Sequence, residues 1–154
     1  MTKSKKLVLI TWLLTLVFIL CAFLPILKFS FNDYSVNIFG ICEEFDSRDR
    51  AAFEYFAPLG YAVFAVIALA ALTQVLYLTA ATKDASKAKG KRKFSVVMTG
   101  IAVVAFAGYL LLVAGRSDYT LTAVPFLFVA AGLAFIVLSG QSFKMKDMTQ
   151  DETR

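Results

Sequence analysis

Residues 94–115, FSVVMTGIAVVAFAGYLLLVAG, form a run of 22 residues that contains no Asp, Glu, Lys or Arg. A helix rises about 1.5 Å per residue, so about 20 residues cross the hydrocarbon core of a bilayer, which is about 30 Å thick. A helix on the surface of a soluble core keeps a polar stripe that faces water, and this run has no charged residue to supply one. The run therefore predicts a transmembrane helix.

Three further runs without formal charge are also long enough to cross, with 21, 28 and 25 residues. They cover residues 7–27, 55–82 and 119–143. The composition agrees, because 59% of the 154 residues are hydrophobic and 18% are charged, against about 45–50% and about 25% in soluble domains. We expect an all-α membrane protein, a four-transmembrane-helix bundle in which residues 1–154 form a single integral membrane domain.

Basic residues separate the two sides of this predicted bundle. Residues 1–6, 83–93 and 144–154 lie on one side of a four-span chain and hold twelve of the 16 Lys and Arg residues. Positive charge collects in the cytoplasmic loops of membrane proteins. We therefore expect a multi-pass protein of the plasma (inner) membrane with both termini in the cytoplasm.

The predicted cytoplasmic loop 83–93, KDASKAKGKRK, carries six of these twelve basic residues. A basic loop this short, held at both ends by spans, lies at the lipid headgroups, where each basic residue gains about 1 kcal/mol from anionic lipid. This favours a topology signal that contacts lipid over a nucleic-acid site. The candidate lipid contacts are Lys83, Lys87, Lys89, Lys91, Arg92 and Lys93.

The outer loop 28–54 is the one sizeable region expected outside the membrane, and its first half alternates apolar and polar residues. Asn32-Asp33 is a turn signal between two such runs, so a short β-hairpin is predicted. The alternative is an irregular loop whose aromatic rings lie at the membrane interface. The candidate partner contacts are Phe29, Phe31, Tyr34, Val36 and Ile38.

This region also carries a resemblance. Residues 23–40, FLPILKFSFNDYSVNIFG, place Leu-Pro at the end of the first span and follow it with an outer loop of alternating aromatic, Ser and Gly residues. In this respect the chain resembles a group of small bacterial four-span membrane proteins of unassigned function. The layout is loosely similar to the claudin-type arrangement, but the paired tryptophans and cysteines of that family's first outer loop are missing.

Within the spans, Gln74 is the most polar residue and is expected to face another helix, because an amide that faces lipid lacks hydrogen-bond partners. A solute contact is its alternative role. Small residues such as Gly100 and Gly108 form a stripe along the third span that is expected to meet a neighbouring helix, within the chain or in a homo-oligomer.

Several functional classes are disfavoured by the residues present. The chain has no histidine and two cysteines, Cys21 and Cys42, too far apart for a C-x-x-C motif. No span holds the acidic or basic residue that usually marks ion-coupled transport. We therefore expect no enzyme, no cofactor, no metal and no nucleic-acid partner.

Two hypotheses follow. The first is a non-enzymatic structural or accessory subunit whose outer loop contacts a membrane or envelope protein. The alternative is a small oligomeric carrier or channel-like protein for an uncharged or apolar solute, with Gln74 on its path. Cys42, the one cysteine of the outer loop, leaves open an intermolecular disulfide.

Overall fold

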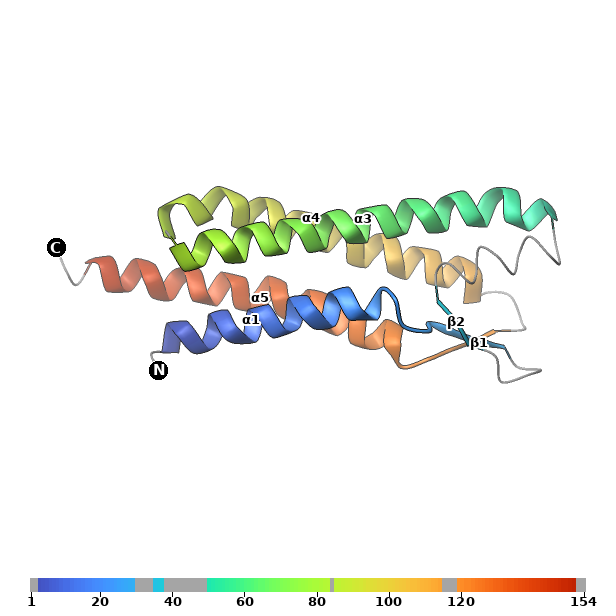
Figure 1. Cartoon of the computed structure of the whole chain (residues 1–154), viewed down its shortest axis with the longest axis horizontal. Helices are drawn as coiled ribbons and strands as arrows, with labels where there is room; N and C mark the ends of the chain where they lie inside the picture. The colour runs from blue at the N-terminus through green and yellow to red at the C-terminus, as the bar shows by residue number, and fades with distance from the viewer. Residues whose placement is uncertain (1–2, 30–34, 38–49, 84, 115–118, 152–154) are drawn as a thin grey trace.

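The computed structural model describes residues 3–29, 35–37, 50–83, 85–114 and 119–151. Within these ranges the chain is mainly helical, with one small sheet (Figure 1). The helices are α1 (Lys3–Cys21), α3 (Arg50–Lys83), α4 (Ala85–Ala114) and α5 (Val124–Asp151), and the strands are β1 (Leu27–Phe29), β2 (Ser35–Val36) and β3 (Tyr119–Leu121). The predicted helical fold with a short antiparallel hairpin is thus confirmed in outline.

Three of the helices contain stretches that are long and apolar enough to cross a membrane. These stretches are Pro58–Lys83 in α3, Ala88–Val113 in α4 and Val124–Gln141 in α5. The apolar part of α1 is shorter and covers Lys6–Cys21. At about 1.5 Å per residue it is about 24 Å long.

The prediction that the first helix continues to residue 27 was wrong. The last helical-type bonds join the N–H groups of Phe23 and Leu24 to the carbonyl of Leu20, and the chain then enters β1. Pro25 explains the end of the helix, since proline has no N–H and restricts the residue before it to extended conformations.

The fourth predicted span also begins later than expected. Residues 119–121 are β3, and α5 starts at Val124. The second predicted span lies inside a longer helix, because α3 starts at Arg50. The predicted loop 83–93 is not a loop, because α4 starts at Ala85 and its first turns contain most of the basic residues.

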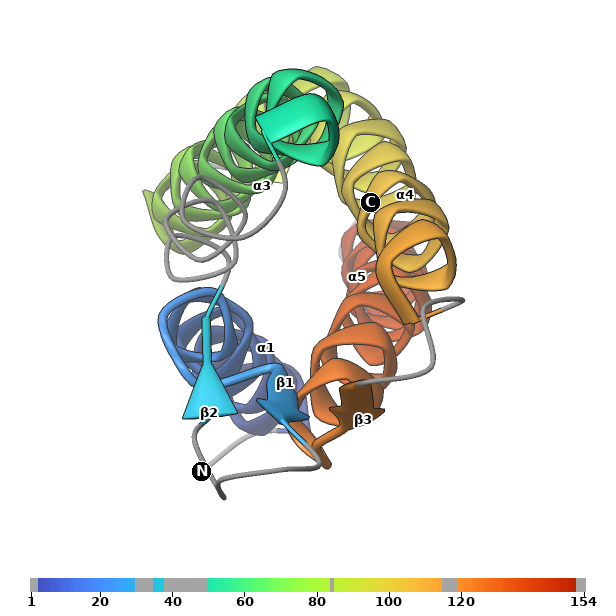
Figure 2. The ribbon, with the colours of Figure 1, turned by 90° about the vertical axis from the view of Figure 1, so that its right-hand side faces the viewer.

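Each of the four helices lies beside two others. Contacts join α3 to α4, α4 to α5, α5 to α1 and α1 to α3, and the view along the helices shows this ring (Figure 2). The three strands lie at one end of the molecule. The start of α1, the end of α3, the start of α4 and the end of α5 all lie at the opposite end (Figure 1). We call this the basic end.

The interior near the sheet is packed with aromatic rings. Phe128 of α5 stacks on Phe18 of α1 with ring centroids 4.2 Å apart, and its ring centroid lies 4.4 Å from that of Phe106 of α4. All three side chains are buried. Aromatic pairs add about 0.5–1.5 kcal/mol to the burial of their area, so this cluster joins three helices.

The close approach between helices occurs at Gly132. A Cβ added to Gly132 of α5 would lie 2.5 Å from Cγ2 of Val103 and 3.5 Å from the ring of Phe18. The predicted contact of Gly108 with a helix of the same chain was wrong: Gly108 is exposed, and a Cβ added there would meet no atom within 4 Å. Gly100 also has open space at that position.

The outside of the helices is apolar along much of their length. Large hydrophobic side chains are exposed on all four helices, among them Leu16 of α1, Leu72 of α3, Leu111 of α4 and Phe126 of α5, with 55–77% of their surface accessible. Soluble monomers rarely expose contiguous apolar patches of more than a few hundred Å². This surface is compatible with a membrane protein.

Candidate functional site

The strands form one three-stranded sheet with the order β2-β1-β3. Both neighbours run antiparallel to the central strand, with Leu27 opposite Val36 on one side and opposite Leu121 on the other. Because β1 is paired on both edges, its backbone groups form hydrogen bonds to both neighbouring strands. The sheet therefore joins the segment after α1 to the segment before α5.

Thr122 fixes this junction. Its hydroxyl lies 2.8 Å from the carbonyl oxygen of Pro25, to which it donates, and 3.3 Å from that of Ile26. The backbone N–H of Thr122 donates to the same Ile26 carbonyl at 3.1 Å. The Thr122 hydroxyl also accepts a bond from the N–H of Val124, the first residue of α5, which satisfies one of the N–H groups that have no partner within the helix at its start. One side chain thus holds both the α1–β1 turn and the start of α5.

Two further side chains reinforce the turn and the sheet. Thr120 of β3 donates to the carbonyl of Lys28 at 3.2 Å. Asn37, directly after β2, donates to the carbonyl of Phe23 at 3.3 Å. Both bonds are exposed, and each joins segments that lie apart in the sequence.

The predicted partner contacts fall on or beside this sheet. Phe29 is the last residue of β1 and pairs with Tyr119, while Val36 lies in β2. The other three candidates, Phe31, Tyr34 and Ile38, lie outside the described residues. The hairpin pairing of β1 with β2 agrees with the predicted strand–turn–strand pattern.

Sequence reasoning missed β3. Residues 119–121 were assigned to the fourth span because they carry no charge. The signal that was available is composition, since Tyr119, Thr120 and Thr122 are aromatic or β-branched residues that favour strands over the residues of a helix start.

The basic residues gather at the other end of the molecule. Lys83 ends α3, and the other candidate lipid contacts lie in the first turns of α4. This stretch is helical because Ala, Lys and Arg are good helix formers. Lys83, Lys89, Lys91 and Lys93 are exposed, as a contact with anionic lipid requires; Lys87 belongs to α4, and its side chain lies outside the described part.

Arg92 differs from the lysines around it. It is half-buried, and a Cβ added to Gly140 of α5 would lie 3.4 Å from its terminal nitrogen. Its guanidinium therefore packs against α5 where glycine leaves room. Arg92, one of the six predicted lipid contacts, is thus directed by the fold toward another helix.

Polar side chains form a layer across the interior between two apolar clusters. On α3, Gln74 lies between Ala70 of the cluster near the sheet and Tyr77 of a smaller cluster near the basic end. The Gln74 amide nitrogen donates to the hydroxyl of Thr99 on α4 at 2.9 Å, and that hydroxyl donates to the carbonyl of Ser95 at 2.8 Å. Gln74, Thr99 and Ser95 are all fully buried.

This geometry agrees with the expectation that Gln74 faces another helix. Its side chain joins α3 to α4, the arrangement that an amide within an apolar helix pair requires. Two atoms of the layer, Gln74 Oε1 and Ser95 Oγ, have no hydrogen-bond partner among the residues that the structure describes.

Cys21 ends α1 and is a buried, free thiol. Cys42 lies outside the described residues. Across the described ranges, no three His, Cys, Asp or Glu side chains come together in a group that could hold a metal ion.

Comparison with known proteins adds no relative: no protein-family model, curated protein or solved structure matches this chain.

Proposed function

We propose that this chain is a non-enzymatic integral membrane protein, a structural or accessory subunit that contacts a membrane or envelope protein through the three-stranded sheet. In this proposal α1, α3, α4 and α5 all span the plasma (inner) membrane as a four-helix bundle. The sheet lies outside, and both termini lie in the cytoplasm.

The proposal that α1 is the fourth span rests on its outer surface. Leu9, Leu13, Leu16 and Leu20 are all about half exposed and recur along one face from end to end. Phe23 and Leu24 continue this apolar surface beyond the helix. The exposed side chains from Leu9 to Leu24 are hydrocarbon, and such a surface is stable in lipid and costly in water.

The proposed orientation rests on the separation of charge along the molecule. The exposed lysines at the start of α4 lie at the basic end, and the sheet lies at the other end (Figure 1). Because positive residues are retained on the cytoplasmic side, the basic end is placed inside and the sheet outside.

The pairing of β1 with β3 is the observation that carries the proposed role. A connection that only links two spans does not need a strand bonded to a partner more than 90 residues away, or a threonine that holds the turn. A rigid element outside the membrane is the usual place for recognition, since scaffolded loops carry most binding functions.

Site-specific photo-crosslinking in intact cells tests this role. A benzophenone amino acid is placed at Phe29 or Val36 of the full chain, with Val104 as the matched control because that side chain is 72% exposed on α4. We expect a discrete protein adduct from the sheet positions and none from position 104. Correct insertion with no discrete adduct from either sheet position would contradict the accessory role.

A second candidate is the carrier for an uncharged solute. The observation that favours it is the pair of buried atoms, Gln74 Oε1 and Ser95 Oγ, which have no hydrogen-bond partner in the described part of the chain. Flux of water and glycerol in liposomes tests this candidate. Flux that requires both Gln74 and Ser95 would favour it over the accessory role.

A further inference from the structure

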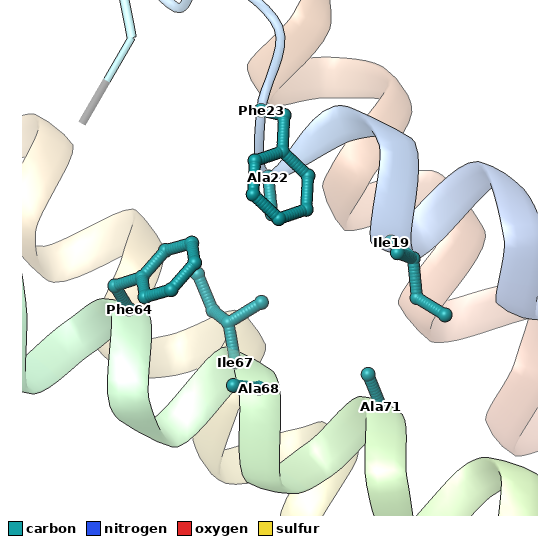
Figure 3. Close-up of a pocket in the computed structure, with 7 residues that line it drawn as sticks. All are labelled: Ile19, Ala22, Phe23, Phe64, Ile67, Ala68 and Ala71. Atoms are coloured by element: carbon teal, nitrogen blue, oxygen red, sulfur yellow. The ribbon is translucent and has the colours of Figure 1, made fainter. Parts of the chain in front are cut away.

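A groove lies on the side of the molecule between α1 and α3. It has a volume of about 220 Å³, and every side chain that lines it is a hydrocarbon. From the α1 side it is lined by Ile19, Ala22 and Phe23, and from α3 by Phe64, Ile67, Ala68 and Ala71. These side chains point toward one another across the gap (Figure 3).

The fold explains why these two helices leave space. Because α1 ends at Cys21, its chain turns away toward β1 and brings no further turn of helix against α3. Opposite this end, α3 presents Ala68 and Ala71, whose methyl groups are too short to fill the gap. The rings of Phe23 and Phe64 meet edge to face with centroids 5.7 Å apart and close one end of the groove.

The groove lies at hydrocarbon depth if the helices span as proposed. Phe64 and Ala71 are about 9 Å and about 20 Å below Pro58, the start of the apolar stretch of α3. They therefore fall within a hydrocarbon core of about 30 Å. The groove is open at its side, because Phe23 and Ala68 are exposed.

Size and chemistry restrict what fills it. Water needs two to four polar partners, and the lining side chains offer none. An empty space of this volume forfeits dispersion contacts on all its walls. An apolar protein cavity of about 150 Å³ binds benzene, so this groove accommodates several methylene groups, whereas a partner helix, about 10–12 Å across, is too wide to enter.

We propose that the α1–α3 groove binds one acyl chain of a phospholipid, held between the Phe23–Phe64 ring pair and the Ala68–Ala71 face. This inference rests on the proposed membrane location. The groove continues the apolar surface formed by Leu20, Leu69 and Leu72, which are exposed beside it. An acyl chain that enters from that surface exchanges contacts with other lipids for contacts with side chains of both α1 and α3.

The test uses the full chain in liposomes of phosphatidylcholine and phosphatidylglycerol that contain a phosphatidylcholine with a diazirine in its acyl chain. After illumination, adducts are mapped by mass spectrometry of peptides. We expect adducts to concentrate on residues 19–23 and 64–71, several-fold above those on the lipid-facing positions Val104 and Leu111 of α4.

Matched variants separate the groove from the general surface. Ala68→Leu fills the groove and is expected to reduce its adducts several-fold. Ala65→Leu adds the same atoms at an exposed position of α3 that does not line the groove and is expected to leave the adducts unchanged. Ala71→Leu is the second filling variant, used if Ala68→Leu lowers the thermal stability in detergent.

The outcomes are distinct. Adducts spread evenly over α1, α3, α4 and α5, and unchanged by Ala68→Leu and Ala71→Leu, mean that only surface lipid is present and overturn the proposal. A chain that does not remain in the vesicles after carbonate extraction refutes the membrane location itself. A chain that remains and shows evenly spread adducts refutes the acyl-chain site alone.

Discussion

The hydroxyl of Thr122 lies 2.8 Å from the carbonyl oxygen of Pro25, although the two residues are 97 positions apart in the chain. Pro25 lies in the turn that ends the first helical segment, and Thr122 lies just before α5. This bond and the pairing of β1 with β3 hold together two connections that hydropathy alone would treat as unrelated. The geometry leads to a set of predictions about the sheet, the helix contacts and the topology.

Loss of the Thr122 hydroxyl is expected to destabilise the protein. Thr122→Val keeps the shape but removes the bonds that the hydroxyl makes with Pro25 and Val124, while the backbone N–H still donates to Ile26. Each intramolecular hydrogen bond contributes about 0.5–1.5 kcal/mol. We expect a loss of about 1–2 kcal/mol in the free energy of unfolding, measured by thermal or denaturant unfolding in detergent. Thr120→Val, which removes one exposed bond of 3.2 Å, is the control and is expected to cost less; equal costs would argue against a special role for Thr122.

A larger side chain is expected to destabilise the protein at Gly132 and to have little effect at Gly108. Gly132→Leu places atoms where Val103 and Phe18 already lie, and overpacking typically costs about 1–3 kcal/mol. Gly108→Leu extends into open space and is expected to change the melting temperature little. The measurement is the melting temperature of each variant in the same detergent. A larger decrease for Gly108→Leu than for Gly132→Leu would mean that α4 presents a different face to its neighbours.

The Gln74–Thr99 hydrogen bond is expected to contribute modestly. Interhelical hydrogen bonds in membranes average about 0.6 kcal/mol in double-mutant cycles. We expect a coupling energy of about that size from unfolding of Gln74→Leu, Thr99→Val and the double variant. A coupling near zero would show that the 2.9 Å contact adds no stability.

Val36→Asp is expected to disrupt the sheet and leave the helices in place. The residue that pairs with position 36 is Leu27, which is fully buried, and a charge opposite a buried leucine is costly unless it is paired. Circular dichroism should show unchanged helix content, while the 28–54 region becomes more sensitive to protease added outside the cell. Gln74→Leu is the control; loss of helix content in Val36→Asp would show instead that the sheet is needed for the helices to pack.

Cysteine labelling tests the proposed topology. Cys42 should react with a membrane-impermeant maleimide in intact cells, and a cysteine introduced by Ser86→Cys should react only after permeabilisation. Cys21 is expected to react poorly in both cases because 2% of its surface is accessible. The reverse pattern at positions 42 and 86 would invert the orientation.

Much of the helical framework can be read from the chain. Charge-free runs of 20 or more residues predict α3, α4 and α5, because the cost of placing charge in hydrocarbon is summed residue by residue and needs no knowledge of neighbours. The strand–turn–strand pattern of the first outer loop also predicts the pairing of β1 with β2, because the two strands of a hairpin are close in sequence. The contact of the Gln74 amide with another helix is also predictable, because lipid offers the amide no hydrogen-bond partner.

Only the tertiary structure decided the features that depend on distant segments. The residue types at 119–122 favour a strand, but nothing in them identifies β1, more than 85 residues earlier in the chain, as the partner of β3. Gly132, and not Gly108, meets neighbouring helices because the rotation of α4 and α5 about their axes is set by the packing of Phe18, Phe106 and Phe128. Hydropathy measures what each residue gains from lipid, whereas pairing and rotation depend on the shapes of surfaces that meet only after the chain has folded.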